Sequence, residues 1–249
     1  MDSFTLKSIA LITMLIDHIG YVFFPECYIL RFIGRIAFPI YAFLLIQGFL
    51  HTRKSTKLKK YIQRMFIFAL ISEVSFDLCF YEQPFYPAYQ NVYFTLFLGL
   101  MALYFYEYLE SKNKDGFYSI ILFCAIAFLL KTDYNVIGTI YFFSFYFIEK
   151  AKENKKSIKF QNMLYFILIF VIALFEIVTS AYDLTIKAIW ESFKQYSWVY
   201  LGLFLSIIPI SLYNGKLGYK TKTTQFVFYW FYPIHITVIY LIYNLIKIL

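Results

Sequence analysis

Long apolar runs separated by short polar segments make up most of the chain. A helix that spans a bilayer needs about 20 apolar residues. Runs near that length predict about nine helices, with ends defined to within a few residues: roughly 5–24, 30–50, 62–80, 92–109, 117–131, 134–149, 160–181, 196–213 and 226–248. The fifth and sixth runs are short, and either tilt or form a hairpin that does not fully cross. The pattern predicts an all-α polytopic membrane helical bundle, a single transmembrane domain over residues 1–249.

The polar segments alternate in charge along the chain. "HTRKSTKLKK", "EKAKENKKSIK" and "NGKLGYKTKTT" follow the second, sixth and eighth runs and are strongly basic, while "ESKNKDG" after the fourth is mixed. The intervening segments are acidic or nearly neutral: "PECYI", "YEQPFYPAYQN", "KTDYN" and "YDLTIKAIWESFKQ". Because basic loops stay in the cytoplasm, we expect a multi-pass protein of the inner (cytoplasmic) membrane, with a cytoplasmic N-terminus.

Composition supports a lipid bilayer as the surroundings. The chain is 61% hydrophobic and 15% charged, with a mean hydropathy of +0.64, whereas soluble domains carry about 25% charged residues. The net charge is +8, which could suggest nucleic acid. The basic residues lie between apolar runs, however, as expected beside anionic lipid, so we expect no nucleic-acid partner.

Ionisable side chains also lie inside the apolar runs, where burial costs several kcal/mol unless they are paired or hydrated. They are Asp17 and His18 in the first run, Arg31 and Arg35 in the second, Glu73 and Asp77 in the third, Glu176 in the seventh and His235 in the ninth. Helical residues four apart share a face. Arg31 and Arg35 therefore form one charged face, and Glu73 and Asp77 form another.

Asp17 and His18 are neighbours in sequence but do not face each other, because adjacent helical side chains point about 100° apart. We therefore expect Asp17 to pair with one of the two arginines of the second run. His18 would take its orienting acid from the third run. Three readings remain open: a structural salt-bridge cluster, a transport pathway, and a polar reaction chamber in which a buried histidine acts as a base.

Two further features bear on function. The basic segment after the second run either sets topology or holds the phosphates of an anionic cosubstrate. Its candidate ligands are His51, Arg53, Lys54, Lys57, Lys59, Lys60 and Arg64. Pro39 and Pro233 lie inside runs and predict helix kinks or breaks beside Arg35 and His235. The chain has no GxSxG, P-loop or HExxH motif, and no spacing favours a metal.

Four segments in order, "LKSIALITMLIDHIGYVFF", "LRFIGRIAFPIYAFLLIQGFLHTR", "YIQRMFIFALISEVSFDL" and "NVYFTLFLGL", resemble the TraX family. These membrane proteins are named after the protein required for N-terminal acetylation of the pilin of F-type conjugation. The resemblance covers roughly the first 100 residues. The positions that match the family's motifs are Asp17, His18, Arg31, Arg35, His51, Arg53, Glu73, Asn91 and Thr95. "FYPIH" in the last run is similar to a segment of the wider group of multi-span acyltransferases.

The resemblance implies a membrane acetyltransferase that takes acetyl-CoA from the cytoplasm and acetylates an acceptor outside. The acceptor would be a pilin-like peptide amine or a glycan. In this reading His18 is the general base or carries the acetyl group, with His235 as second candidate, and Glu73 or Asp77 orients the imidazole. Arg31 or Arg35 balances the acids and stabilises an oxyanion. The alternatives are a small transporter with an intramembrane charged pathway and an assembly factor without chemistry.

Overall fold

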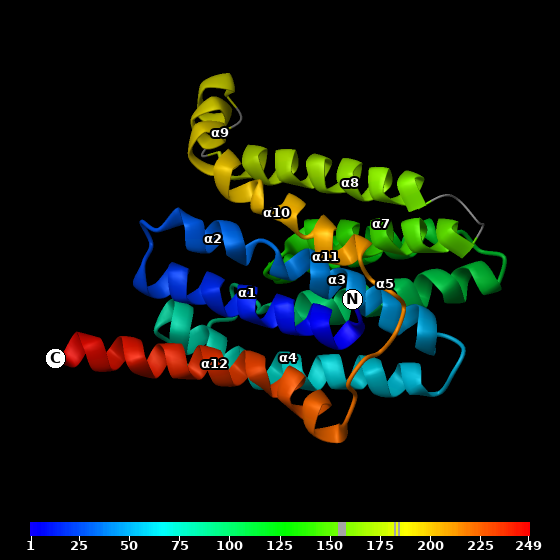
Figure 1. Cartoon of the computed structure of the whole chain (residues 1–249), viewed down its shortest axis with the longest axis horizontal. Coiled ribbons are helices and arrows are strands. Elements are labelled where there is room, and N and C mark those ends of the chain that lie inside the picture. Colours follow the sequence, from blue (N-terminus) through cyan, green and yellow to red (C-terminus); the bar gives the residue numbers. More distant parts are fainter. Residues whose placement is uncertain (154–157, 182, 184) are drawn as a thin grey trace. The chain divides into compact units, whose positions relative to one another are not determined.

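The computed structural model describes residues 1–153, 158–181, 183 and 185–249, and these fold almost entirely into helices (Figure 1). The helices are α1 (Ser3–Phe23), α2 (Tyr28–Gly34), α3 (Ala37–Thr52), α4 (Lys57–Tyr81), α5 (Val92–Ser111), α6 (Phe117–Leu130), α7 (Asn135–Glu153), α8 (Ile158–Thr179), α9 (Ile186–Tyr200), α10 (Gly202–Leu205), α11 (Ile207–Ser211) and α12 (Lys222–Ile248). Across those ranges the only β-type pairing is one isolated bridge, between Gln90 and Thr132. The all-α prediction is confirmed. The predicted loops "EKAKENKKSIK" and "YDLTIKAIWESFKQ" extend partly outside the described residues, at 154–157 and at 182 and 184.

Two compact units divide the chain. Unit 1 comprises Met1–Tyr41 and Phe147–Thr221, and unit 2 comprises Ala42–Tyr146 and Lys222–Leu249. Each unit is therefore built from two separate stretches of sequence, and α3 and α7 each contribute to both. The expectation of a single domain stays a prediction.

Within the described part of the chain, five helical segments are long and apolar enough to cross a membrane. They are Ser3–Phe23, Tyr28–Thr52, Val92–Ser111, Phe160–Thr179 and Lys222–Ile248. They coincide with the first, second, fourth, seventh and ninth predicted runs, and α6 is a shorter apolar helix. Such a set of helices is that of a multi-pass membrane protein. The count of nine spans and the cytoplasmic N-terminus stay predictions.

The eighth run was predicted as one helix over 196–213, and this is wrong. The chain there forms the end of α9 and the short helices α10 and α11. Gly202 lies so close to α2 that an added Cβ would be 2.0 Å from the carbonyl oxygen of Phe32. Pro209 also lacks the N–H that a continuous helix needs. The residues from Ile186 onward, which the charge pattern predicts to be a loop, instead form α9. Thr185 caps this helix by accepting from the N–H of Ala188.

The second run is interrupted between α2 and α3, ahead of Pro39 rather than at it. Gly34 ends α2 in direct contact with α1, because an added Cβ would lie 2.0 Å from Asp17 Oδ1. Pro39 lies in the first turn of α3, where a missing N–H disrupts no helical hydrogen bond. Because Gly34 has no side chain, the carboxylate of Asp17 lies directly against the backbone at the end of α2.

Pro233 does not break α12, which continues through it. Because proline has no N–H, the carbonyl of Tyr229 four residues earlier loses its helical donor. The hydroxyl of Tyr93 on α5 donates to that carbonyl at 3.0 Å. A side chain from a neighbouring helix thus replaces the missing backbone donor. Of the predicted kink or break at this position, the break is wrong and the kink stays a prediction.

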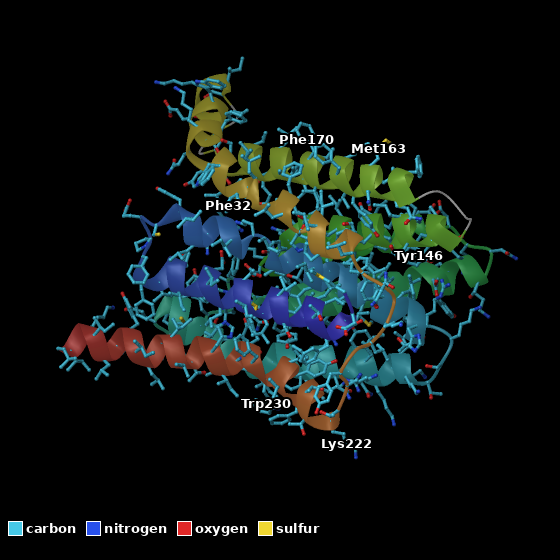
Figure 2. The ribbon with its side chains drawn as sticks, in the orientation of Figure 1. Phe32, Tyr146, Met163, Phe170, Lys222 and Trp230 are labelled. Carbon is cyan, nitrogen blue, oxygen red and sulfur yellow. The ribbon has the colours of Figure 1, made fainter. Side chains whose placement is uncertain are left out.

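In unit 2, α4 packs against α5 and α12, and α12 runs alongside α4 (Figure 1). Phe68 on α4 contributes to this contact, with its ring 5.1 Å from that of Tyr229 and 5.5 Å from that of Trp230. Trp230 is labelled on α12 in Figure 2. The opposite face of α4 exposes large apolar side chains: Phe66, Ile67, Leu70, Ile71 and Val74. An exposed apolar stripe of this length suits contact with lipid. The polar residues of α4 lie on the other side of the helix, which packs against α5 and α12.

Candidate functional site

Asp17 and Arg31 form an ion pair in unit 1. Arg31 Nη1 donates to Asp17 Oδ2 at 2.7 Å, and the same nitrogen lies 3.4 Å from the backbone oxygen of Asp17. The guanidinium also lies over the ring of Tyr21, 5.1 Å from its centroid. The predicted pairing of Asp17 with an arginine of the second run is confirmed, and the arginine is held by three groups of α1.

Arg35, one turn beyond Arg31, faces a second acid in the same unit. Its guanidinium lies 5.1 Å from the centroid of the Tyr200 ring and interacts electrostatically with both Asp17 and Glu176. The hydroxyl of Tyr200 donates to the carboxylate of Glu176 and is 3.1 Å from Ser180 Oγ. Unit 1 therefore balances two acids with two arginines. Tyr200 was not anticipated from the sequence.

His18 lies next to this network on α1. It is half-buried and within electrostatic reach of Arg31. The acids expected to orient its imidazole, Glu73 and Asp77, belong to unit 2. That orientation, like the catalytic role of His18, stays a prediction.

Glu73 in unit 2 binds the start of α5. Its Oε2 accepts from the side-chain amide of Asn91 and from the Asn91 backbone N–H, the latter at 3.3 Å. Asn91 is the N-cap of α5, because its Oδ1 accepts from the N–H of Tyr93 at 2.9 Å, and its Nδ2 also donates to the Ala69 carbonyl at 2.8 Å. The carboxylate therefore lies at the positive end of a helix dipole.

Asp77, one turn further along α4, is fully buried. Its Oδ2 accepts from the backbone N–H of Tyr86 at 2.7 Å. The other carboxylate oxygens, Glu73 Oε1 and Asp77 Oδ1, are buried without a hydrogen-bond partner among the residues that the structure describes, as is the hydroxyl of Ser72. Over the same residues neither carboxylate forms an ion pair. The acids of α4 are thus held by neutral donors alone.

Helix α12 adds a histidine and a tyrosine to unit 2. Tyr232 lies within electrostatic reach of Glu73, and its hydroxyl accepts from the N–H of Val92. His235 is buried, and its Nδ1 lies 2.7 Å from the carbonyl oxygen of Phe231. Since a carbonyl only accepts, Nδ1 is the donor in this contact. The contact therefore fixes the orientation of the His235 ring against its own helix.

An aromatic segment between α4 and α5 contacts Asp77 through the backbone N–H of Tyr86. The rings of Tyr81 and Tyr86 stack with centroids 4.0 Å apart. The hydroxyl of Tyr89 donates to the backbone carbonyl of Asp133 at 2.9 Å. Burial, together with the nearby Asp133, raises the pKa of Tyr89, so this phenol stays protonated and continues to donate. The tyrosine-rich segment is thus held by ring stacking and by Asp133, and it contacts Asp77 through the backbone N–H of Tyr86.

The basic residues predicted to bind phosphates surround the turn between α3 and α4. Six of them are exposed: His51, Lys54, Lys57, Lys59, Lys60 and Arg64. Arg53 differs, because its Nη1 lies 2.5 Å from Glu107 Oε1 on α5. The same carboxylate oxygen accepts from the hydroxyl of Tyr146 at 2.8 Å. Nothing in the sequence indicates this pairing, since Glu107 resembles any acid near the polar end of an apolar run.

The sequence model of one protein family, described as "TraX protein", matches residues 3–243. The chain belongs to the TraX family. It is 28% identical over 259 residues to "Probable fimbrial assembly protein FimC, serogroup H1" of Dichelobacter nodosus, across 96% of this chain and 94% of that protein. It is 30% identical over 125 residues to an uncharacterized protein of Rickettsia prowazekii (strain Madrid E), across 50% of this chain and 44% of that one. No solved structure matches the chain.

The TraX match extends well beyond the first 100 residues that carry the resemblance, and includes most of α12 with His235. Two residues of the TraX-like fourth segment have structural roles. Asn91 caps α5 and holds Glu73, and Thr95 Oγ1 accepts from the N–H of Tyr134 at 3.4 Å. Both contacts fix the start of α5.

Proposed function

We propose that this TraX-family chain is a membrane-embedded acetyltransferase of the inner membrane. It would move an acetyl group from cytoplasmic acetyl-CoA to an extracytoplasmic, pilin-like peptide amine. Family membership and the fimbrial assembly role in the printed name of the Dichelobacter nodosus relative support a place in pilus or fimbria assembly. The observation that carries the chemical step is the Asp17–Arg31 ion pair, which fixes a guanidinium close to His18 inside an apolar helix.

In this reaction the acceptor amine attacks the carbonyl carbon of the thioester. His18 accepts the proton that the attacking nitrogen loses, or transiently carries the acetyl group. Arg31 or Arg35 stabilises the negative charge that develops on the carbonyl oxygen. The C–S bond then breaks, and the CoA thiolate takes up a proton to leave as the free thiol. His235 is the second candidate for the base.

The phosphates of acetyl-CoA would bind the exposed basic residues at the turn between α3 and α4. Six of the seven predicted ligands are exposed there, and lysine and arginine hold phosphate by charge-assisted hydrogen bonds. Arg53 is the weakest of the set, because Glu107 already holds its guanidinium.

His18→Ala tests the proposal in purified protein reconstituted in nanodiscs with acetyl-CoA and a peptide acceptor. Loss of a general base lowers the rate by a factor of about 10²–10⁴, so CoA release should fall by at least about 100-fold. Lys112→Ala, an exposed lysine after α5, is the control and should match the wild type. Activity near wild type in His18→Ala, together with loss in His235→Ala, would transfer the role to His235.

Replacing the peptide acceptor by a cell-surface glycan tests the main alternative acceptor, a sugar hydroxyl or amine.

A second function is favoured by the two α4 carboxylates that lack a cation partner among the described residues. This function is a small transporter with an intramembrane charged pathway. It predicts solute uptake into proteoliposomes without CoA, whereas acetyl transfer requires release of CoA.

A further inference from the structure

Helix α9 of unit 1 exposes a row of large apolar side chains. Ile186, Trp190 and Phe193 follow one another at spacings of four and three, which places them on one side of the helix. They are 88%, 56% and 41% exposed. The rings of Trp190 and Phe193 stack, with centroids 5.6 Å apart. These three side chains form a continuous apolar surface, the outer face of α9.

A charged row runs beside the outer face. Lys187, Glu191 and Lys194 repeat the same spacings one position further along, about 100° around the helix, and all three are exposed. Lys194 Nζ lies 5.5 Å from the centroid of the Trp190 ring, so its ammonium is at the edge of the apolar surface. Lysines at such an edge keep their stems on apolar groups and their charge among polar ones. An aromatic face beside a lysine-bearing face is typical of a helix at a membrane surface.

The opposite side of α9 is fixed within unit 1. Ala188 and Ser192 are buried, and Ser192 Oγ donates to the Ile177 carbonyl of α8 at 2.6 Å. Towards the end of the helix, the ring of Trp198 stacks on that of Phe32 in α2, with centroids 5.0 Å apart. The outer face therefore lies on the side of α9 away from α8.

The length and direction of α9 suit the surface of a bilayer better than its interior. Its 15 residues span about 22 Å, whereas the hydrocarbon core is about 30 Å thick. Helix α8 is long and apolar enough to cross that core, and α9 runs across its direction at one end (Figure 1). The last turns of α8 expose a further apolar stripe: Phe170, Val171, Leu174 and Phe175. A lipid-facing surface on α8 thus reaches the end of that helix where α9 is attached.

We infer that α9 lies along the membrane interface and binds the phospholipid surface. Its outer face lies at the boundary between headgroups and acyl chains, and Lys187 and Lys194 reach the lipid phosphates, which accept charge-assisted hydrogen bonds. The partner is therefore lipid rather than a second protein. This inference goes beyond the proposed function and does not depend on acetyl transfer.

Fluorescence of the full chain in nanodiscs tests the position of the outer face. The probes are phosphatidylcholines that carry bromine, a quencher of tryptophan, either near the headgroup or near the methyl end of the acyl chains. The chain has three tryptophans, so Trp198→Phe with Trp230→Phe leaves Trp190 alone. The matched control adds Trp190→Phe and Gln195→Trp to that background. Position 195 is exposed and lies about 140° around the helix from Trp190.

Bromine near the headgroup should quench Trp190 at least about twofold more than bromine near the methyl end, because an interfacial helix reaches only about 5–10 Å into the boundary. The same lipid should quench the control at least about twofold less. Quenching of Trp190 by aqueous iodide but by neither lipid would place the helix in water and overturn the inference. Protection from iodide and from both lipids would show that a protein covers the face. Equal quenching at the two positions would also contradict the inference.

A second measurement uses wild-type protein and does not depend on the folding of variants. A phosphatidylcholine with a photoreactive diazirine in the upper part of one acyl chain is activated in the nanodisc, and mass spectrometry locates the adducts. Trp190 and Phe193 should be labelled, with Phe170 on the exposed stripe of α8 as the internal control (Figure 2). Labelling of Phe170 without labelling of residues 186–194 would reject the inference.

Discussion

The two units each hold a pair of acids among apolar helices, but they treat the charges differently. In unit 1, the carboxylate of Asp17 forms an ion pair with Arg31, and the carboxylate of Glu176 interacts electrostatically with Arg35. The guanidinium of Arg35 also lies over the Tyr200 ring. Acids and cations are equal in number, so the cluster is close to neutral and needs no ligand to be stable.

Unit 2 places its acids against neutral groups instead. Glu73 accepts from Asn91, and Asp77 accepts from the backbone N–H of Tyr86. A balanced buried pair adds little net stability but is costly to break on one side, whereas an unbalanced acid is costly while it remains charged. The first arrangement fixes Arg31 and Arg35 near His18. The second leaves two carboxylates that form no ion pair among the described residues.

The largest effect should come from breaking the unit 1 pair. Arg31→Met removes the cation that holds Asp17 at 2.7 Å. Removing one partner of a buried pair costs about 3–5 kcal/mol. Because the Arg31 and Asp17 side chains are 21% and 18% exposed, the loss of unfolding free energy should lie at the lower end of that range, measured by denaturant unfolding in detergent. In the double variant that combines Asp17→Leu with Arg31→Met, neither charge remains. Its loss of unfolding free energy should therefore be well below the sum of the losses in the two single variants. Additive losses would show that the two side chains do not stabilise each other.

A smaller effect should separate the two units directly. Asp17→Asn leaves Arg31 facing a neutral amide and should lower the free energy of unfolding by about 1.5–3 kcal/mol, the range for a hydrogen bond to a charged group. Asp77→Asn keeps an oxygen for the N–H of Tyr86 and removes a charge with no cation partner. Its stability should match or exceed that of wild type. Equal losses in both variants would contradict the difference between the units.

Much of unit 1 follows from simple sequence rules. The four-residue spacing of Arg31 and Arg35, and the poor geometry of an Asp17–His18 contact, led to the Asp17–arginine pairing that the structure confirms. Tyr200 could not be found in this way. The chain has 25 tyrosines, many near the ends of apolar runs. Which of them meets Arg35 depends on how α9 and α10 pack within the unit.

The apolar-run pattern does not predict helix α9, because the helix mixes polar and apolar side chains. Hydropathy averaged over a window of about 20 residues therefore assigns such a stretch to a loop. A helical period is nevertheless present: Ile186, Trp190 and Phe193, at spacings of four and three, are exposed, while Ala188 and Ser192 are buried. Periodicity identifies a helix that lies outside the predicted runs, where mean hydropathy does not.

The smallest expected effect tests how α12 passes through Pro233 in unit 2. Tyr93→Phe removes the hydroxyl that donates to the Tyr229 carbonyl at 3.0 Å. A single hydrogen bond between membrane helices contributes about 0.6 kcal/mol on average, so unfolding in detergent should shift by roughly that amount. In a Pro233→Ala background the backbone N–H of residue 233 can donate to the same carbonyl, and Tyr93→Phe should then cost close to nothing. An equal cost in both backgrounds would show that the hydroxyl stabilises unit 2 by a contact unrelated to the proline.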